Sequence, residues 1–112
     1  MNSITTHVLD TARGTPAGGV SVTLHFNSPA GWLEAGRGVT NEEGRVSNLL
    51  AGKNLEAGKY RLTFDTAKYL ARFNVSSFFP EVVILFEVQD INQHYHVPLL
   101  LSPFGYSTYR GT

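Results

Sequence analysis

Short segments of alternating apolar and polar residues run along the chain, separated by clusters of Gly, Pro, Asn and Asp. Tyr60, Leu62 and Phe64, for example, alternate with polar residues and fall on one face. A period of two is typical of a half-buried β-strand. Residues 82–86 and 97–101 are apolar throughout and have the length of buried strands. The pattern predicts eight strands, at residues 4–9, 20–26, 32–40, 45–50, 59–65, 81–88, 95–101 and 106–110.

The only helical pattern covers residues 66–73. Asp65 or Thr66 can cap its start, and three apolar residues follow at spacings of three and four. Eight strands, short turns and one helix of about two turns indicate an all-β fold, a sandwich of two sheets. Because the sequence contains no internal repeat, low-complexity tract or linker, we expect a single domain over residues 1–112.

The composition limits the possible partners and the cellular location. Charged residues make up 16% of the chain, below the roughly 25% of average domains, which favours surface buried between subunits. Nine basic and nine acidic residues cancel without any basic run, so we expect neither nucleic-acid nor membrane binding. The chain has no cysteine, which fits a reducing compartment. It also lacks a signal-peptide pattern and any apolar run near the ~18 residues of a membrane span, so we expect a cytoplasmic protein.

The candidate chemistry comes from histidine, arginine and hydroxyl groups, because the sequence contains no standard catalytic motif. His94 and His96 are two residues apart on a predicted strand, so both fall on one face and could converge on one ligand or ion. Alternatively, one is solvated and the other packs as a satisfied polar side chain. His7 has a structural role by default, and Arg45 is either a surface cation or a clamp for a polar or anionic ligand. We assign no role to His25.

Residues 102–112 remain rich in aromatic and β-prone residues to the last position. Chain ends normally fray into polar tails. We therefore expect this segment to be ordered, with the hydroxyl and α-carboxylate of Thr112 lining a site. The alternative is an edge strand that only completes the sheet.

Three stretches of sequence form one recognisable pattern: ITTHVLD at residues 4–10, Gly44-Arg45, and HYHVPLLLSPFGYSTYRGT at residues 94–112. With these motifs the chain resembles the transthyretin-like family of 5-hydroxyisourate hydrolases, enzymes of purine breakdown, over essentially its whole length. The family's most specific mark is Tyr-Arg-Gly followed by a hydroxyl residue. Here that residue is Thr112, where the commoner one is Ser, so the hydroxyl is kept and a methyl is added.

The resemblance implies a transthyretin-type β-sandwich of eight strands with a short helix after the fifth. It also implies a homotetramer, a dimer of dimers, with active sites in the channel between the dimers. The family reaction opens a ring amide of 5-hydroxyisourate to give 2-oxo-4-hydroxy-4-carboxy-5-ureidoimidazoline, without a metal or other cofactor. Matched motif by motif, the catalytic positions are His7, Arg45 and His96. The substrate-binding positions are His7, Arg45, Tyr109, Arg110, Gly111 and Thr112.

These groups suit amide hydrolysis. A neutral imidazole can take a proton from the attacking water and return one to the leaving nitrogen. A guanidinium such as that of Arg45 can stabilise the charge that develops on the carbonyl oxygen. The general base can be either His7 or His96, because ring orientation is not encoded in the spacing.

Two other functions fit the fold. The first is a carrier that binds a small hydrophobic ligand in the tetramer channel, as vertebrate transthyretin binds thyroid hormone, because fold alone does not fix function. Such carriers lack the paired channel histidines and the Tyr-Arg-Gly ending. The second is a zinc hydrolase, in which His7, His94 and His96 would be nitrogen ligands. Because no carboxylate is obviously placed to support those ligands, and because the resemblance implies a hydrolase that needs no metal for turnover, we expect no catalytic metal, only adventitious metal on the clustered imidazoles.

Overall fold

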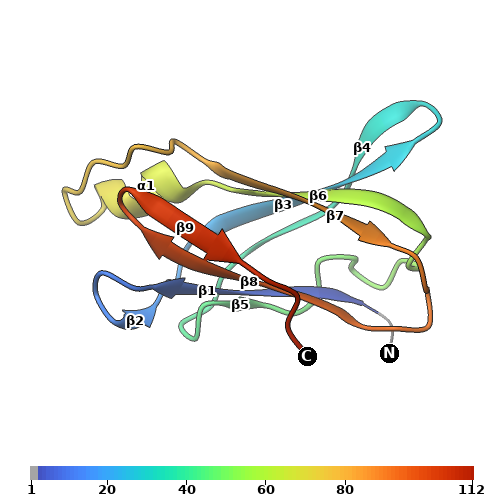
Figure 1. The fold of residues 1–112 in the computed structure, drawn as a ribbon, viewed down its shortest axis with the longest axis horizontal. Helices are drawn as coiled ribbons and strands as arrows, with labels where there is room; N and C mark the ends of the chain where they lie inside the picture. Colours follow the sequence, from blue (N-terminus) through green and yellow to red (C-terminus); the bar gives the residue numbers. More distant parts are fainter. Residues whose placement is uncertain (1–2) are drawn as a thin grey trace.

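The computed structural model describes residues 3–112 as two β-sheets with the core between them (Figure 1). Residues 1 and 2 of the expected domain lie outside the described residues. Sheet A has the order β2 (Thr15–Pro16), β1 (Ile4–Asp10), β8 (Tyr95–Ser102) and β9 (Gly105–Thr108), and β5 (Arg45–Val46) also pairs with β1. Sheet B has the order β4 (Gly31–Val39), β3 (Ser21–Ser28), β6 (Gly58–Phe64) and β7 (Val82–Val88). The predicted all-β fold of two sheets and one short helix is confirmed.

Two strands differ from the sequence prediction. β5 contains only two residues instead of residues 45–50, because Leu49 and Leu50 leave the strand and bury their side chains in the core. The described residues form nine strands rather than eight, because Thr15–Pro16 pairs with the end of β1. Both short strands lie along the same edge of β1, opposite the edge that pairs with β8.

The core consists of the apolar side chains that alternate inward from both sheets. On β6, Tyr60, Leu62 and Phe64 are buried, as the alternation predicts. The expectation that the apolar segment at the start of β7 is buried is wrong for Val83 and Leu85, which are 43% and 60% exposed. β7 forms an edge of sheet B and buries only one face, so this apolar segment leaves two large side chains open to solvent.

The helix α1 (Thr66–Ala71) begins at Asp65, whose carboxylate accepts a hydrogen bond from the backbone N–H of Lys68 at 3.3 Å. This is the usual N-cap arrangement. It ends two residues earlier than predicted, because the N–H groups of Arg72 and Phe73 bond to carbonyls three residues back. Within residues 3–112 no helix is long and apolar enough to cross a membrane.

A buried carboxylate connects α1 to sheet A. Asp10, at the end of β1, is 1% exposed and accepts hydrogen bonds from the Tyr69 hydroxyl at 2.8 Å and the Arg13 N–H at 3.1 Å. The guanidinium of Arg13 lies over the ring of Phe73, 4.0 Å from its centroid. Burial and then the hydrogen bond to Asp10 raise the pKa of Tyr69 to about 12. Removing the phenolic hydroxyl therefore leaves a buried charged oxygen short of one partner.

We predict that Tyr69→Phe lowers the free energy of unfolding by about 1.5–3 kcal/mol at neutral pH, the range for hydrogen bonds to charged groups. Because the raised pKa favours the neutral phenol in the folded state, its contribution is present below pH ~10 and disappears as the pH rises towards 12. The stability difference between wild type and variant should therefore shrink over this range in urea titrations. Tyr106→Phe, which changes an exposed tyrosine, is the control. A pH-independent difference would contradict the pKa assignment.

Candidate active site

The outer face of sheet A brings together three of the expected site residues. Alternation along β1 directs Thr5 and His7 away from the core. Thr5 is opposite His96 in the parallel pairing of β1 with β8, and His7 is opposite Arg45 in the antiparallel pairing with β5. Because paired residues share a face and residues two apart return to it, His7, Arg45 and His96 occupy two adjacent rows of one surface.

A tight turn delivers Arg45 to this surface. The side-chain oxygen of Asn41 accepts hydrogen bonds from the N–H groups of Glu43 and Arg45 at 2.9 and 3.0 Å. Gly44 has φ +79°, and a Cβ at this position would lie 2.4 Å from the carbonyl oxygen of Val8. Its own carbonyl accepts from the Val8 N–H at 2.7 Å. Only glycine lets the turn come this close to β1, which is the physical reason for the Gly-Arg pair.

His94 and His96 are joined through one hydroxyl group. Oγ1 of Thr5 lies 3.0 Å from Nε2 of His94 and 2.8 Å from Nδ1 of His96. The two rings stack with centroids 6.5 Å apart and planes 15° apart. The expectation that this His-x-His pair shares one face is met. The ring of His96 is half-buried, whereas that of His94 is exposed.

The surroundings of His96 favour its neutral form. Burial lowers the pKa of His96, and the positive charge of Arg45 lowers it further, followed by smaller effects of His94 and His7. Desolvation and a nearby cation both destabilise an imidazolium ion. A neutral imidazole has a lone pair on one ring nitrogen and can accept a proton.

These residues line a pocket of about 200 Å³. The residues that can contribute chemistry to it are Arg45, His94, His96 and Thr112. His7 lies beside it, opposite Arg45 in the sheet. The other lining residues are Thr5, Thr6, Val46 and Ser47.

The chain after β9 returns to this pocket through Gly111. Its N–H donates to the carbonyl of His96 at 2.8 Å, which forms an isolated bridge to β8. A Cβ at position 111 would lie 2.6 Å from Cδ2 of His96 and 3.3 Å from Cγ of Pro98. Real Cβ contacts are not this short, so glycine is the residue that fits against the imidazole ring. This bridge brings Thr112 to the pocket.

Tyr109 and Arg110 are placed differently from the other expected site residues. Tyr109 is exposed and lines a separate pocket of about 210 Å³ beside β7. Arg110 lies over the ring of Tyr95 at 4.5 Å and donates to the side chain of Gln93 at 2.7 Å. It also lines a shallow depression with His94, Gly111 and Thr112. Within one chain the structure therefore brings Arg110 near the histidine pair but not Tyr109.

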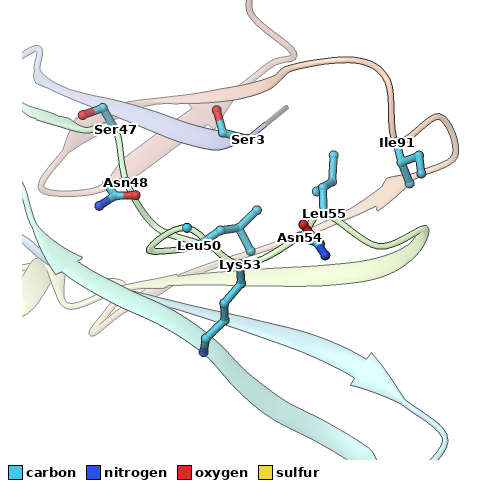
Figure 2. A pocket seen from close by; sticks show the side chains of 9 residues that line it. Ser3, Ser47, Asn48, Leu50, Lys53, Asn54, Leu55 and Ile91 are labelled. Carbon is cyan, nitrogen blue, oxygen red and sulfur yellow. The ribbon is translucent and has the colours of Figure 1, made fainter. Parts of the chain in front are cut away.

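A larger pocket of about 700 Å³ lies next to the site but lacks its chemistry (Figure 2). Ser47 and Asn48 lie at one end and Ile91 at the other, with Ser3, Leu50, Lys53, Asn54 and Leu55 between them. Lys53 is its only charged lining residue, and no histidine or carboxylate lines it. Size alone would select this cavity, whereas the side chains suited to proton transfer and charge stabilisation select the smaller pocket.

The zinc-hydrolase alternative requires three ligand side chains that lie close together. Among residues 3–112 no three His, Asp or Glu side chains are close enough together to hold a metal ion.

His25 lies on β3 of sheet B, opposite Glu34 and Arg61, and so outside this pocket.

The sequence pattern missed two hydroxyl residues that line the site, Thr5 on β1 and Ser47 after β5. Alternation already placed Thr5 on the same face as His7. What it could not supply is the partner strand, because Thr5 and His96 are 91 residues apart along the chain.

The fold and this site define a class of proteins: two-sheet β-sandwiches that carry an arginine and paired histidines on the outer face of one sheet. The profile of the HIUase/Transthyretin family matches residues 4–111, and the chain belongs to this family.

Relatives match nearly the whole chain. A probable 5-hydroxyisourate hydrolase of Caenorhabditis elegans is 46% identical over 110 residues, which cover 98% of this chain and 82% of that protein. Among solved structures, 5-hydroxyisourate hydrolase of Klebsiella pneumoniae superposes with a TM-score of 0.88 at 38% identity and covers 100% of both chains. Sea bream transthyretin in complex with thyroxine superposes with a TM-score of 0.91 at 32% identity, over 97% of this chain and 94% of that chain.

We predict that Gly111→Ala displaces the imidazole ring of His96, because the added methyl group needs the space the ring occupies. The ring ¹⁵N resonances of His96 should shift, reporting loss of the contact with Thr5. In Gly105→Ala the new Cβ would meet only Ser102 Oγ, at 3.8 Å, so this matched variant should leave those resonances in place. Unchanged His96 resonances in Gly111→Ala would show that the glycine is not required by the ring.

Proposed function

We propose that this protein hydrolyses 5-hydroxyisourate, opening a ring amide to give 2-oxo-4-hydroxy-4-carboxy-5-ureidoimidazoline. The main support is structural: His96, His7 and Arg45 lie together on one face of sheet A. In addition, the hydrolase relatives match this chain over nearly its whole length. Residues 1–112 act as one transthyretin-like domain. The lack of cysteine supports a cytoplasmic location.

In this proposal His96 is the general base. Its Nδ1 is occupied by Thr5, which leaves Nε2 to face the pocket, and its lowered pKa keeps it neutral. Nε2 takes a proton from water as the water oxygen attacks the ring carbonyl. The C–N bond then breaks, the leaving nitrogen receives a proton, and the acyl carbon becomes a carboxylate. His7, in the adjacent row, orients the water or the substrate.

Arg45 acts on the carbonyl oxygen. As water adds, this oxygen acquires negative charge, and the guanidinium beside His96 stabilises it. Removal of one such donor typically lowers the rate about 10²–10³-fold. The same cation holds the imidazole of His96 neutral, so it contributes to two steps.

The segment after β9 completes substrate binding in this proposal. Gly111 gives the imidazole room, and the hydroxyl of Thr112 holds a polar atom of the substrate in the pocket. Arg110 acts next to His94. Tyr109 lines the separate pocket beside β7, so it can contact the substrate only in the site of a second copy of the chain.

We propose a homotetramer, a dimer of dimers, with the outer faces of sheet A lining the channel. Its support is the exposed apolar surface at the edge of the sandwich formed by β7 and β9, which includes Leu85, Tyr106 and Tyr109. Open strand edges with apolar side chains pair with other chains unless they are covered.

The overall fold does not separate a hydrolase from a carrier, because a hydrolase and a thyroxine-bound transthyretin superpose about equally well. The side chains favour the hydrolase. A channel lined by three imidazoles and a guanidinium would present polar groups to a hydrophobic ligand, and their desolvation would weaken its binding.

We predict that the purified protein accelerates the ultraviolet decay of freshly generated 5-hydroxyisourate above the spontaneous rate. His96→Asn and Arg45→Glu should each lower kcat/KM by about 10²-fold or more, since loss of a general base has effects of about 10²–10⁴-fold. His25→Asn, in the other sheet, should retain most of the activity. Wild-type turnover by His96→Asn would remove this histidine from the mechanism.

The same assay, repeated after treatment of the protein with a chelator, tests the zinc-hydrolase and carrier alternatives. Activity that survives prior chelation supports the imidazole and guanidinium mechanism, whereas loss on chelation that zinc restores would establish the metal hydrolase. A folded wild-type protein that leaves the decay unchanged would favour the carrier.

We further predict a solution mass of four times the 12.3 kDa chain by light scattering at micromolar concentration. Leu85→Glu should reduce this mass, because it places a charge on the exposed edge of β7. Leu33→Glu, at the opposite edge of sheet B on β4, is the control and should remain tetrameric. A monomer mass for the wild-type protein would refute the assembly.

A further inference from the structure

The hydroxyl of Thr5 lies between two imidazole nitrogens. It is 2.8 Å from Nδ1 of His96 and 3.0 Å from Nε2 of His94. The second nitrogen of His94, Nδ1, lies 3.0 Å from Oγ of Ser3. These contacts form one unbranched series from His96 through Thr5 and His94 to Ser3.

The number of protons allows only two orientations of this series. A hydroxyl group has a single proton, so Thr5 donates to one imidazole and accepts from the other. For Nε2 of His96 to be a base, its Nδ1 must carry the ring proton and donate to Thr5. Thr5 then donates to Nε2 of His94, and Nδ1–H of His94 donates to Ser3. In the opposite orientation, Nε2 of His96 carries the proton and can act only as an acid.

We infer that Thr5, His94 and Ser3 form a proton relay that sets the tautomer of His96 and connects it to solvent. The inference rests on the proposed hydrolysis and adds positioning residues to that site. When Nε2 of His96 takes a proton from water, its Nδ1–H bond breaks and an O–H bond forms on Thr5. The former Thr5 O–H bond breaks as an N–H bond forms on Nε2 of His94. His94 then releases its Nδ1 proton to water, either directly or through Ser3, which accepts this proton as it passes its own hydroxyl proton to water.

The product of this transfer is His96 with a proton on Nε2, which is the form that can protonate the leaving nitrogen. The two orientations of the relay therefore correspond to the base and acid steps of one turnover. Proton transfer in the opposite direction along the series returns the ring proton of His96 to Nδ1 and restores the base form. The relay leaves His96 from Nδ1, whereas the proton from water arrives at Nε2, so the two transfers use different ring nitrogens.

The charges around the two rings favour outward movement of the proton. Arg45 and His7 lie on the His96 side, where positive charge disfavours an imidazolium ion. His94 is exposed, so water can solvate its charged form. The guanidinium of Arg110 donates a hydrogen bond to the backbone carbonyl of His94 at 3.4 Å, and this contact helps to fix the backbone that carries the His94 ring.

The test compares Thr5→Val, which has nearly the same shape without the hydroxyl, with Thr5→Ser, which keeps it. We expect Thr5→Val to lower kcat about tenfold to a hundredfold with KM within about twofold, the effect of impaired proton transfer rather than binding. Thr5→Ser should stay near wild type. Thr23→Val, on the outer face of sheet B, controls for replacing threonine by valine on a strand.

His94→Ala tests the solvent end of the relay, because its exposed ring leaves space that a small base can enter. We expect a similar loss of kcat, restored in proportion to added imidazole, whereas imidazole should not rescue Thr5→Val. Wild-type kcat in Thr5→Val or His94→Ala, or loss in His94→Ala without imidazole rescue, would overturn the relay.

Ring ¹⁵N spectroscopy tests the same inference without turnover. The wild type should show His96 mainly with its proton on Nδ1, and Thr5→Val should show a mixture of tautomers. The same tautomer in both proteins would overturn the tautomer assignment even if the enzyme were active. Failure of the wild type to accelerate substrate decay would instead reject the proposed hydrolysis, so the two failures are distinguishable.

Discussion

The parallel pairing of β1 with β8 is the constraint on which the rest of the site depends. It places Thr5 opposite His96 and His7 opposite Pro98, while the other edge of β1 positions Arg45. A shift of one residue in this register would turn His96 towards the core and bury an imidazole among Val8, Leu99 and their neighbours. The register is fixed because Ile4, Val8, Val97 and Leu99 all have to point inward at once. The geometry of the catalytic face is thus a direct product of core packing on the opposite face.

Much of the fold could be predicted from the sequence, because each long strand carries its own period-two pattern. Tyr60, Leu62 and Phe64 reveal which way β6 faces without knowledge of its neighbours. The failures occur where local pattern is not the deciding influence. β5 is only two residues long because Leu49 and Leu50 leave the strand and are buried in the core, and Val83 and Leu85 stay exposed because they lie on the outer face of sheet B. Neither fact is a property of the segment alone.

The same division applies to the candidate site. His94 and His96 were expected to share a face, and spacing within one strand was sufficient for that. Their link through Thr5 depends on strands from the two ends of the chain, so it could not be predicted from spacing. The Gly-Arg and Tyr-Arg-Gly motifs were recognised as patterns, but their reason is steric. Each glycine occurs where a Cβ would collide, with a β1 carbonyl at Gly44 and with an imidazole at Gly111.

The distance in sequence between β1 and β8 also determines the order in which the protein can form. His7 and Arg45 are close enough along the chain to pair early, but the pairing of Thr5 with His96 must close a loop of 91 residues, and non-local strand pairing is slow. During synthesis at about 5–20 residues per second, β1 waits on the order of ten seconds for its partner. Ile4 and Val8, fully buried in the finished protein, lack their β8 neighbours for that time and are exposed to mispairing. A complete catalytic face can therefore exist only on a molecule whose two ends have met, so activity reports completed folding as well as chemistry.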